Sequence, residues 1–256
     1  MVDALTISST GMNAQQTMID IIANNLANIN TTSFKKTRVN FQDLIYAAVQ
    51  QGPDATQTLP ILGLGTSIGQ TQKMFAQGDL KATDRILDLA ISGDGFFEIQ
   101  LPNGNKAYTR SGSFQVNDQG YLTNNDGYLV GNGIQIPSDV EDLVFEETGL
   151  VKARLAGDKD LSVLGEISLT RFSNNSGLLP IGDNQYQATR ASGDAMVYQP
   201  SQNNTGLVAQ GYLETSNVAL VEEMTNLMMA QRAYQINSKV AQVSDEIMSL
   251  INQIKR

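Results

Sequence analysis

The clearest hydrophobic pattern lies at the C-terminal end of the chain, where apolar residues recur at alternating steps of three and four positions. Such steps place the residues on one stripe of a helix, with two apolar positions in each heptad. The stripe comprises Met229, Ala233, Ile236, Val240, Val243, Ile247, Leu250 and Ile254. The pattern therefore predicts a long helix over residues 217–256 whose stripe packs against another helix.

A shorter heptad pattern over residues 1–30 predicts an N-terminal helix. Its apolar positions are Leu5, Met12, Ile19 and Leu26, with Ile22 and Ile29 beside them. The other faces hold mostly uncharged amides and hydroxyls, whereas a helix that faces water usually carries charges. Two interpretations stay open, a surface helix rich in amides or a helix enclosed by other protein or confined water. The two terminal helices can pair within one molecule, pack against neighbouring copies, or do both.

Between the helices the pattern changes to short apolar runs that are separated by turn residues. Asn103-Gly104 stands between the strand-like runs 96–101 and 106–110, which is a strong signal for a β-hairpin. Further turns at 117–120 and 124–127 recur at the spacing of an antiparallel β domain. Residues 50–69 are rich in Gln, Gly, Thr and Pro and predict an extended loop or a loose hairpin.

The predicted fold class is α+β, with an antiparallel β domain inserted between N- and C-terminal helices that form a coiled-coil assembly domain. The sequence divides into helices over 1–30 and 217–256, an extended connector or hairpin region over 31–80, and a β-rich outer domain over 81–216. Such a layout suits a protein whose ends build a shared core and whose middle projects outward.

Composition narrows the function classes. The 256 residues include no histidine and no cysteine, so histidine-based triads and zinc–sulfur sites are excluded, and no catalytic residue, cofactor or metal site is predicted. The net charge of −9 argues against a nucleic-acid partner. No run of 18 apolar residues predicts a membrane span, and no signal peptide is visible. We therefore expect a cytosolic protein, or one exported by a route that reads no cleaved signal.

Four stretches of the chain carry a family resemblance. Residues 23–36 read ANNLANINTTSFKK, and residues 11–16 fit ahead of them. Two central stretches are 90–97 and 108–114, and the C-terminal stretch comprises 210–218 and 231–239. Together these stretches resemble the bacterial flagellar rod and hook proteins. One departure is Ser33, where the family usually has glycine, so serine would be strained if that position requires a positive φ.

The resemblance implies a structural subunit that is exported through the flagellar type III apparatus without cleavage. Such subunits polymerise into a hollow tube, with both terminal helices as its innermost layer. The rod crosses the peptidoglycan of the periplasm and transmits motor torque to the hook. The implied partners are further copies of the chain, other rod proteins, the hook protein, the P- and L-ring proteins, peptidoglycan and the export apparatus.

The resemblance also implies which residues take part in assembly. At the C-terminal end they are the eight residues of the stripe. At the N-terminal end they are Leu5, Met12, Ile19, Ile22, Asn24, Asn25, Leu26, Asn28, Ile29, Phe34 and Lys35.

Within the family, the length and the segment after residue 46 resemble the members that form the distal part of the rod, where an insertion is thought to keep the rod straight. The corresponding stiffening-loop residues are Gln50, Gln51, Gly52, Pro53, Thr58, Leu59 and Pro60. The alternatives are a proximal rod or short hook-type protein, and a fibre protein or adhesin outside the flagellum. An enzyme on a β scaffold is disfavoured because the chain lacks histidine and cysteine and shows no nucleophile motif.

Overall fold

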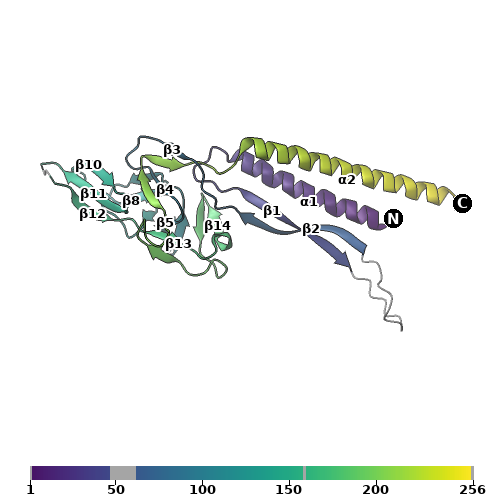
Figure 1. Ribbon diagram of the computed structural model, residues 1–256, viewed down its shortest axis with the longest axis horizontal. Coiled ribbons are helices and arrows are strands. Elements are labelled where there is room, and N and C mark those ends of the chain that lie inside the picture. Colours follow the sequence, from purple (N-terminus) through teal and green to yellow (C-terminus); the bar gives the residue numbers. More distant parts are fainter. Residues whose placement is uncertain (1, 47–61, 158–159, 255–256) are drawn as a thin grey trace, which may run out of the picture. The chain divides into compact units, whose positions relative to one another are not determined.

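The computed structural model describes residues 2–46, 62–157 and 160–254, and it separates the chain into two compact units (Figure 1). The helix–hairpin unit comprises Met1–Ala27, Thr37–Lys73 and Ala219–Arg256. The β unit comprises Asn28–Lys36 and Met74–Val218. The chain therefore passes between the two units four times, after residues 27, 36, 73 and 218.

The helix–hairpin unit contains two long helices and one antiparallel hairpin. Its elements are α1 (Val2–Ala27), β1 (Thr37–Tyr46), β2 (Leu62–Lys73) and α2 (Leu220–Ile254). Both predicted terminal helices are thus present, although α1 ends three residues before residue 30 and α2 begins three residues after residue 217. Glu222 and Glu223 lie in the first turn of α2, where carboxylates stabilise a helix through its dipole. Residues 62–69, for which a loop or a loose hairpin was expected, are paired with β1.

The two helices lie side by side and run antiparallel (Figure 1). Near one end Asn25 of α1 contacts Glu223 of α2, and further along Gly11 faces Asn237. A Cβ atom on Gly11 would lie 2.7 Å from the side-chain nitrogen of Asn237, so the missing side chain allows this close approach. Neither helix, within its described residues, is long and apolar enough to cross a membrane.

The β unit is built from short strands in several small sheets. Its elements are β3 (Leu80–Ala82), β4 (Leu89–Ser92), β5 (Phe96–Gln100), β6 (Lys106–Thr109), β7 (Phe114–Val116), β8 (Leu122–Asn124), β9 (Leu129–Val130), β10 (Val140–Phe145), β11 (Leu150–Leu155), β12 (Ser162–Glu166), β13 (Leu169–Arg171), the 3₁₀ helix η1 (Asn175–Gly177), β14 (Leu179–Gly182), β15 (Gln185–Gln187), β16 (Met196–Tyr198), β17 (Leu207–Gln210) and β18 (Tyr212–Glu214).

The largest sheet has nine strands, with β14, β15, β6, β5, β9, β8 and β7 in spatial order and β13 and β16 attached to it through β5. Strands β10, β11 and β12 form a second sheet, and β17–β4 and β18–β3 are two-stranded. The pairings among the described strands are antiparallel, which confirms the predicted α+β class with antiparallel strands.

The hairpin predicted at Asn103-Gly104 joins β5 to β6, and Gly104 adopts the positive φ of 80° that such a turn requires. The core of the β unit lies around β5, where Phe97 packs edge-to-face on Phe114 with ring centroids 5.2 Å apart. A second aromatic cluster is centred on Phe96 and Tyr186. The β unit therefore has a hydrophobic core of its own, made of two clusters.

Candidate functional site

The first candidate surface is the apolar stripe of α2. Six of its large side chains lie on the exposed side of the helix, and we call these six the α2 stripe. They are Met229, Ile236, Val240, Val243, Ile247 and Leu250, with exposed fractions of 55%, 63%, 45%, 44%, 42% and 57%. A soluble helix normally turns such residues inward, and exposed apolar patches mark sites of association.

The face of α2 that packs against α1 carries small and polar side chains instead. Ala230 and Ser244 are buried there, and Asn237 faces Gly11 of α1. The sequence left open whether the stripe packs within one molecule, against neighbouring copies, or both, and in the single chain the α2 stripe lies outside the contact between α1 and α2. Small side chains permit the close approach of the helices, and the bulky stripe is left on the outside.

The end of α2 also extends beyond its partner helix (Figure 1). Because Asn25 pairs with Glu223 and Gly11 faces Asn237, the first residue of α1 faces α2 at about residue 246. Ile247 and Leu250 therefore lie in the part of α2 that α1 does not cover.

The predicted N-terminal assembly residues are divided between buried and exposed positions. Ile22, Asn25, Phe34 and Lys35 are buried, and Asn24 is exposed. The half-buried positions are Leu5, Met12, Ile19, Leu26, Asn28 and Ile29.

Asn25 joins three elements of the helix–hairpin unit. Its Nδ2 donates to the carbonyl of Thr37 at 2.9 Å and to Glu223 Oε2 at 3.3 Å, and its Oδ1 accepts from the Thr37 N–H at 2.9 Å. The start of β1 is thereby held against both helices.

Two groups of predicted residues cannot be placed. The stiffening-loop residues Gln50, Gln51, Gly52, Pro53, Thr58, Leu59 and Pro60 lie outside the described residues. The side chain of Ile254, the last residue of the predicted stripe, lies outside them as well.

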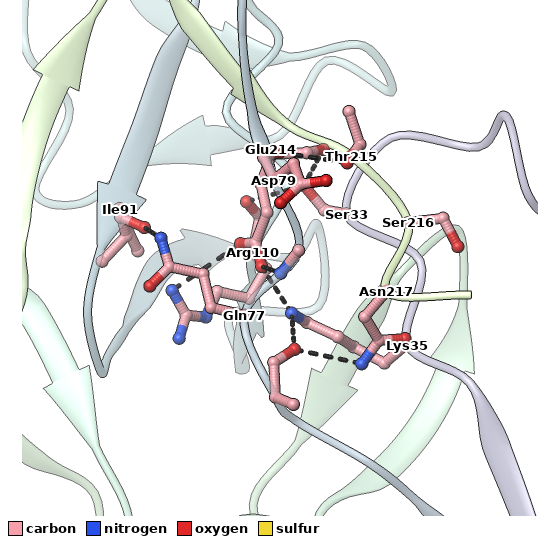
Figure 2. Close-up of polar contacts among 12 residues, drawn as sticks. Ser33, Lys35, Gln77, Asp79, Ile91, Arg110, Glu214, Thr215, Ser216 and Asn217 are labelled. Atoms are coloured by element: carbon pink, nitrogen blue, oxygen red, sulfur yellow. Dashed lines mark hydrogen bonds and ion pairs between the residues drawn. The ribbon is translucent and has the colours of Figure 1, made fainter. Parts of the chain in front are cut away.

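The second candidate site is a buried polar cluster in the β unit, which we call the junction cluster (Figure 2). It consists of Ser33, Lys35, Arg110, Glu214 and Asn217. Its members come from three stretches of the chain that are far apart in sequence. The residues on either side of Ser33 and Asn217 lead to points where the chain leaves the β unit.

Lys35 and Glu214 form a fully buried ion pair at the centre of the cluster. Lys35 Nζ lies 2.5 Å from Glu214 Oε1 and also donates to the carbonyl of Ala76 at 2.8 Å. Glu214 Oε1 accepts a further bond from the backbone N–H of Gly78 at 2.9 Å. The pair thus connects the stretch before β1, the stretch after β2, and the strand before α2.

Arg110 adds a second buried cation. Its Nη1 lies 3.7 Å from Glu214 Oε2, and its Nη2 donates to the carbonyl of Gly93 at 2.8 Å. Burial lowers the pKa of both Lys35 and Arg110, and the Glu214 carboxylate opposes the shift in each case. One carboxylate therefore serves two cations, so Glu214 is the residue on which the charge balance of the cluster depends.

Ser33, where the resemblance implied a glycine, has a φ of 58°. The expected backbone strain is therefore present. Two hydrogen bonds offset it, because the Ser33 N–H donates to the carbonyl of Glu214 at 2.8 Å and Oγ donates to the carbonyl of Arg110 at 3.0 Å. A glycine at this position would lack the second bond.

Asn217 connects the backbone at three of the chain's exits from the β unit. Its Oδ1 accepts from the N–H of Lys36 at 2.8 Å, and its Nδ2 donates to the carbonyls of Met74 and Ala76 at 2.8 and 3.0 Å. Its own N–H donates to the carbonyl of Phe34 at 3.3 Å, and the N–H of Met74 donates to the carbonyl of Lys36 at 2.9 Å. Lys36, Met74 and Asn217 are thus bonded to one another in a triangle.

Arg110, Glu214 and Asn217 are absent from the residues that the sequence singled out. All three lie in stretches that resemble the family, and charged residues are only 17% of this chain. A lone charge inside a strand-like stretch is the sequence signal by which Arg110 and Glu214 could have been found. Among the described residues, no group of three or more acidic side chains could hold a metal ion.

Comparison with protein families gives three matches along the chain. The family described as "Flagella basal body rod protein" matches residues 5–35. "Flagellar hook protein FlgE/F/G D1 domain" matches residues 90–153, and "Flagellar basal body rod FlgEFG protein C-terminal" matches residues 209–254.

Individual relatives match over nearly the whole chain. The flagellar basal-body rod protein FlgG of Buchnera aphidicola subsp. Baizongia pistaciae is 42% identical over 98% of this chain and 99% of its own length. The protein of the same name from Borreliella burgdorferi is 41% identical over the full length of both chains. The flagellar hook-basal body complex protein FlhP of Bacillus subtilis is 30% identical, also over both full lengths.

Proposed function

The chain belongs to the family of flagellar basal-body rod proteins, and on that premise we propose that it is a subunit of the distal rod. The resemblance found in the sequence motifs is confirmed, and so is the expectation of a structural protein rather than an enzyme. In the proposed role the chain polymerises into a rigid hollow tube that transmits motor torque to the hook and lets exported subunits pass.

The α2 stripe is the observation that carries the proposal. Its side chains are 42–63% exposed although their spacing is that of a helix seam. Fully burying one large apolar side chain is worth about 1.5–3 kcal/mol, and covering the exposed half of each stripe residue gains part of that. Six such residues along one face together favour association. The occupant that fits best is the terminal helices of neighbouring copies, because a homopolymer brings the same helices together at every step.

We further propose a role for each part of the chain, as the family membership implies. The coiled-coil assembly domain consists of the helices within 1–30 and 217–256, the connector with the stiffening loop lies in 31–80, and residues 81–216 form the outer β-rich domain. The assembly residues predicted at both chain ends then pack between copies of the chain.

The remaining partners are proposed on the same basis. They are other rod proteins, the hook protein, the P- and L-ring proteins and peptidoglycan around the rod, and the type III apparatus that exports the chain without a cleaved signal. The proposed location is the rod where it crosses the periplasm.

A charge placed in the α2 stripe tests self-assembly. Ile247→Asp puts a carboxylate at a position that becomes buried in the polymer, which costs several kcal/mol per subunit contact. Gln242→Asp is the matched control, because Gln242 is exposed and lies about 140° around the helix from Ile247. We expect straight hollow tubes by electron microscopy from the native chain and the control, and none from Ile247→Asp. Normal polymerisation of Ile247→Asp would contradict the proposal.

A deletion within Gln50–Leu59 tests the distal assignment. If this loop wedges between neighbouring subunits, its removal frees the axial sliding that lets a tube bend. The deletion variant should still be exported and assembled, but its rods should be curved in negative-stain micrographs of basal bodies. Straight rods from the deletion variant would favour another axial member of the family.

A further inference from the structure

The junction cluster lies where the chain enters and leaves the β unit. Three exits, at Lys36, Met74 and the residue after Asn217, are bonded to one another by the Asn217 side chain and by the Met74–Lys36 backbone bond. The Lys35–Glu214 ion pair (Figure 2) joins the same three stretches. Lys35 Nζ donates to the carbonyl of Ala76, and Glu214 Oε1 accepts from the N–H of Gly78.

These contacts fix positions more than they add stability. A buried ion pair repays little more than the cost of removing two charges from water, and apolar residues of the same size are often as stable. An ion pair with directed hydrogen bonds instead holds the segments that carry it in one defined arrangement. Asn217 acts in the same way, since its amide bonds to backbone groups of two other stretches, at Lys36 and at Met74 and Ala76, and so joins both to its own stretch.

We propose that Asn217, with the Lys35–Glu214–Arg110 ion cluster, is a positioning device for the rod subunit. It holds the exits of the β unit at fixed separations, so that a load arriving through one connecting segment is shared by the others instead of bending a single strand. The mechanical part of this inference, the sharing of load, rests on the proposed function. The positional part, the fixed separation of the exits, does not.

Two asparagine variants of the full-length chain test the positional part. Asn217→Ala removes the side chain that joins the exits. Asn117→Ala is the matched control, because Asn117 Oδ1 accepts only from the N–H groups of Gln119 and Tyr121 within its own turn. The measurement is amide hydrogen exchange of the unassembled chain, with Leu122, which donates to the carbonyl of Ile134 at 2.9 Å, as the reference for opening of the whole β unit.

Exchange at Lys36 and Met74 should become at least tenfold faster in Asn217→Ala and stay unchanged in Asn117→Ala. Exchange at Leu122 should stay unchanged in both variants. Equal acceleration at Leu122 would reduce Asn217 to an ordinary stabilising residue and overturn the inference. Unchanged exchange at Lys36 and Met74 would overturn it too. If Asn217→Ala does not fold, Asn217→Ser keeps a short polar side chain and allows the same comparison.

The mechanical part is tested in a strain whose only copy of this chain is the Asn217→Ala variant. Rods should form in native numbers, but their curvature should vary from rod to rod in electron micrographs. Rods as straight as the native ones would overturn the mechanical role. Failure of the native chain itself to form tubes would overturn the proposed function, and the exchange experiment would still decide the positional role.

Discussion

In the β unit Phe97, Phe114 and Leu122 are fully buried, whereas in the helix–hairpin unit Ile236, Ile247 and Leu250 are 63%, 42% and 57% exposed. The β unit thus completes its core within one chain. The helix–hairpin unit buries mainly small residues between its helices and leaves its bulky stripe outside.

Apolar residues that are buried within one chain and apolar residues that are buried only in an assembly thus look alike in a sequence. Helix formation in water is marginal unless an apolar face is packed, so α2 gains most of its stability only when its stripe is covered. We therefore interpret the β unit as a preformed module and the helix–hairpin unit as the part that assembly completes.

Truncating one apolar residue in each of the two units should have opposite consequences for stability and assembly. Phe97→Ala should lower the free energy of unfolding of the β unit by about 3–5 kcal/mol, because it leaves a cavity beside Phe114. Ile236→Ala should change the stability of the unassembled chain by less than about 0.5 kcal/mol, yet it should weaken polymerisation. Urea unfolding followed by the near-ultraviolet circular dichroism of the tyrosines measures the first effect, and sedimentation of polymer measures the second. A loss of several kcal/mol in unassembled Ile236→Ala would mean that the stripe is already packed.

The charges of the junction cluster give the next largest effect. Glu214→Gln leaves Lys35 and Arg110 buried without the carboxylate that pairs with both of them, so it should cost the β unit about 3–5 kcal/mol. Lys35→Met leaves the Arg110–Glu214 pair with balanced charge and should cost less, about 1–3 kcal/mol for the lost hydrogen bonds. The same urea titration compares the two variants. If Lys35→Met is the more damaging of the two, the assignment of Glu214 as the shared counter-ion is wrong.

Two glycines provide the smallest and most local comparison. A Cβ at Gly112 would lie 1.6 Å from the backbone oxygen of Leu89, which cannot move aside, so Gly112→Ala should destabilise the β unit by about 3 kcal/mol. At Gly11 the nearest atom belongs to the flexible side chain of Asn237, and alanine gains about 1 kcal/mol in helix propensity. Gly11→Ala should therefore change stability by less than about 1 kcal/mol in thermal unfolding. A large loss there would show that the two helices pack as rigidly as the β unit.

Local patterns predicted the elements of the fold well. The two terminal helices and the Asn103-Gly104 hairpin follow from neighbours in the sequence. They depend on helical periodicity and a two-residue turn, and such features are encoded within a few residues. The positive φ at Ser33 was raised only by the family resemblance.

What the sequence could not predict depends on distant residues. Heptad spacing shows that the stripe lies on one side of α2, but the direction of that side depends on which face fits Gly11 of α1. The Lys35–Glu214 pair joins residues 179 positions apart, and Asn217 bonds to Met74, 143 positions away. No periodic pattern specifies such pairs, because they form only when the fold brings the stretches together.

Hydrogen exchange along α2, compared between the unassembled chain and its polymer, measures whether assembly packs this helix. If assembly completes the helix–hairpin unit, amides around Ile236, Val243 and Leu250 should exchange rapidly in the unassembled chain and at least a hundredfold more slowly in the polymer. Amides around Phe97 and Leu122 in the β unit should be equally protected in both. Strong protection of α2 before assembly, with no further slowing in the polymer, would show that the single chain already packs this helix and that assembly does not complete the unit.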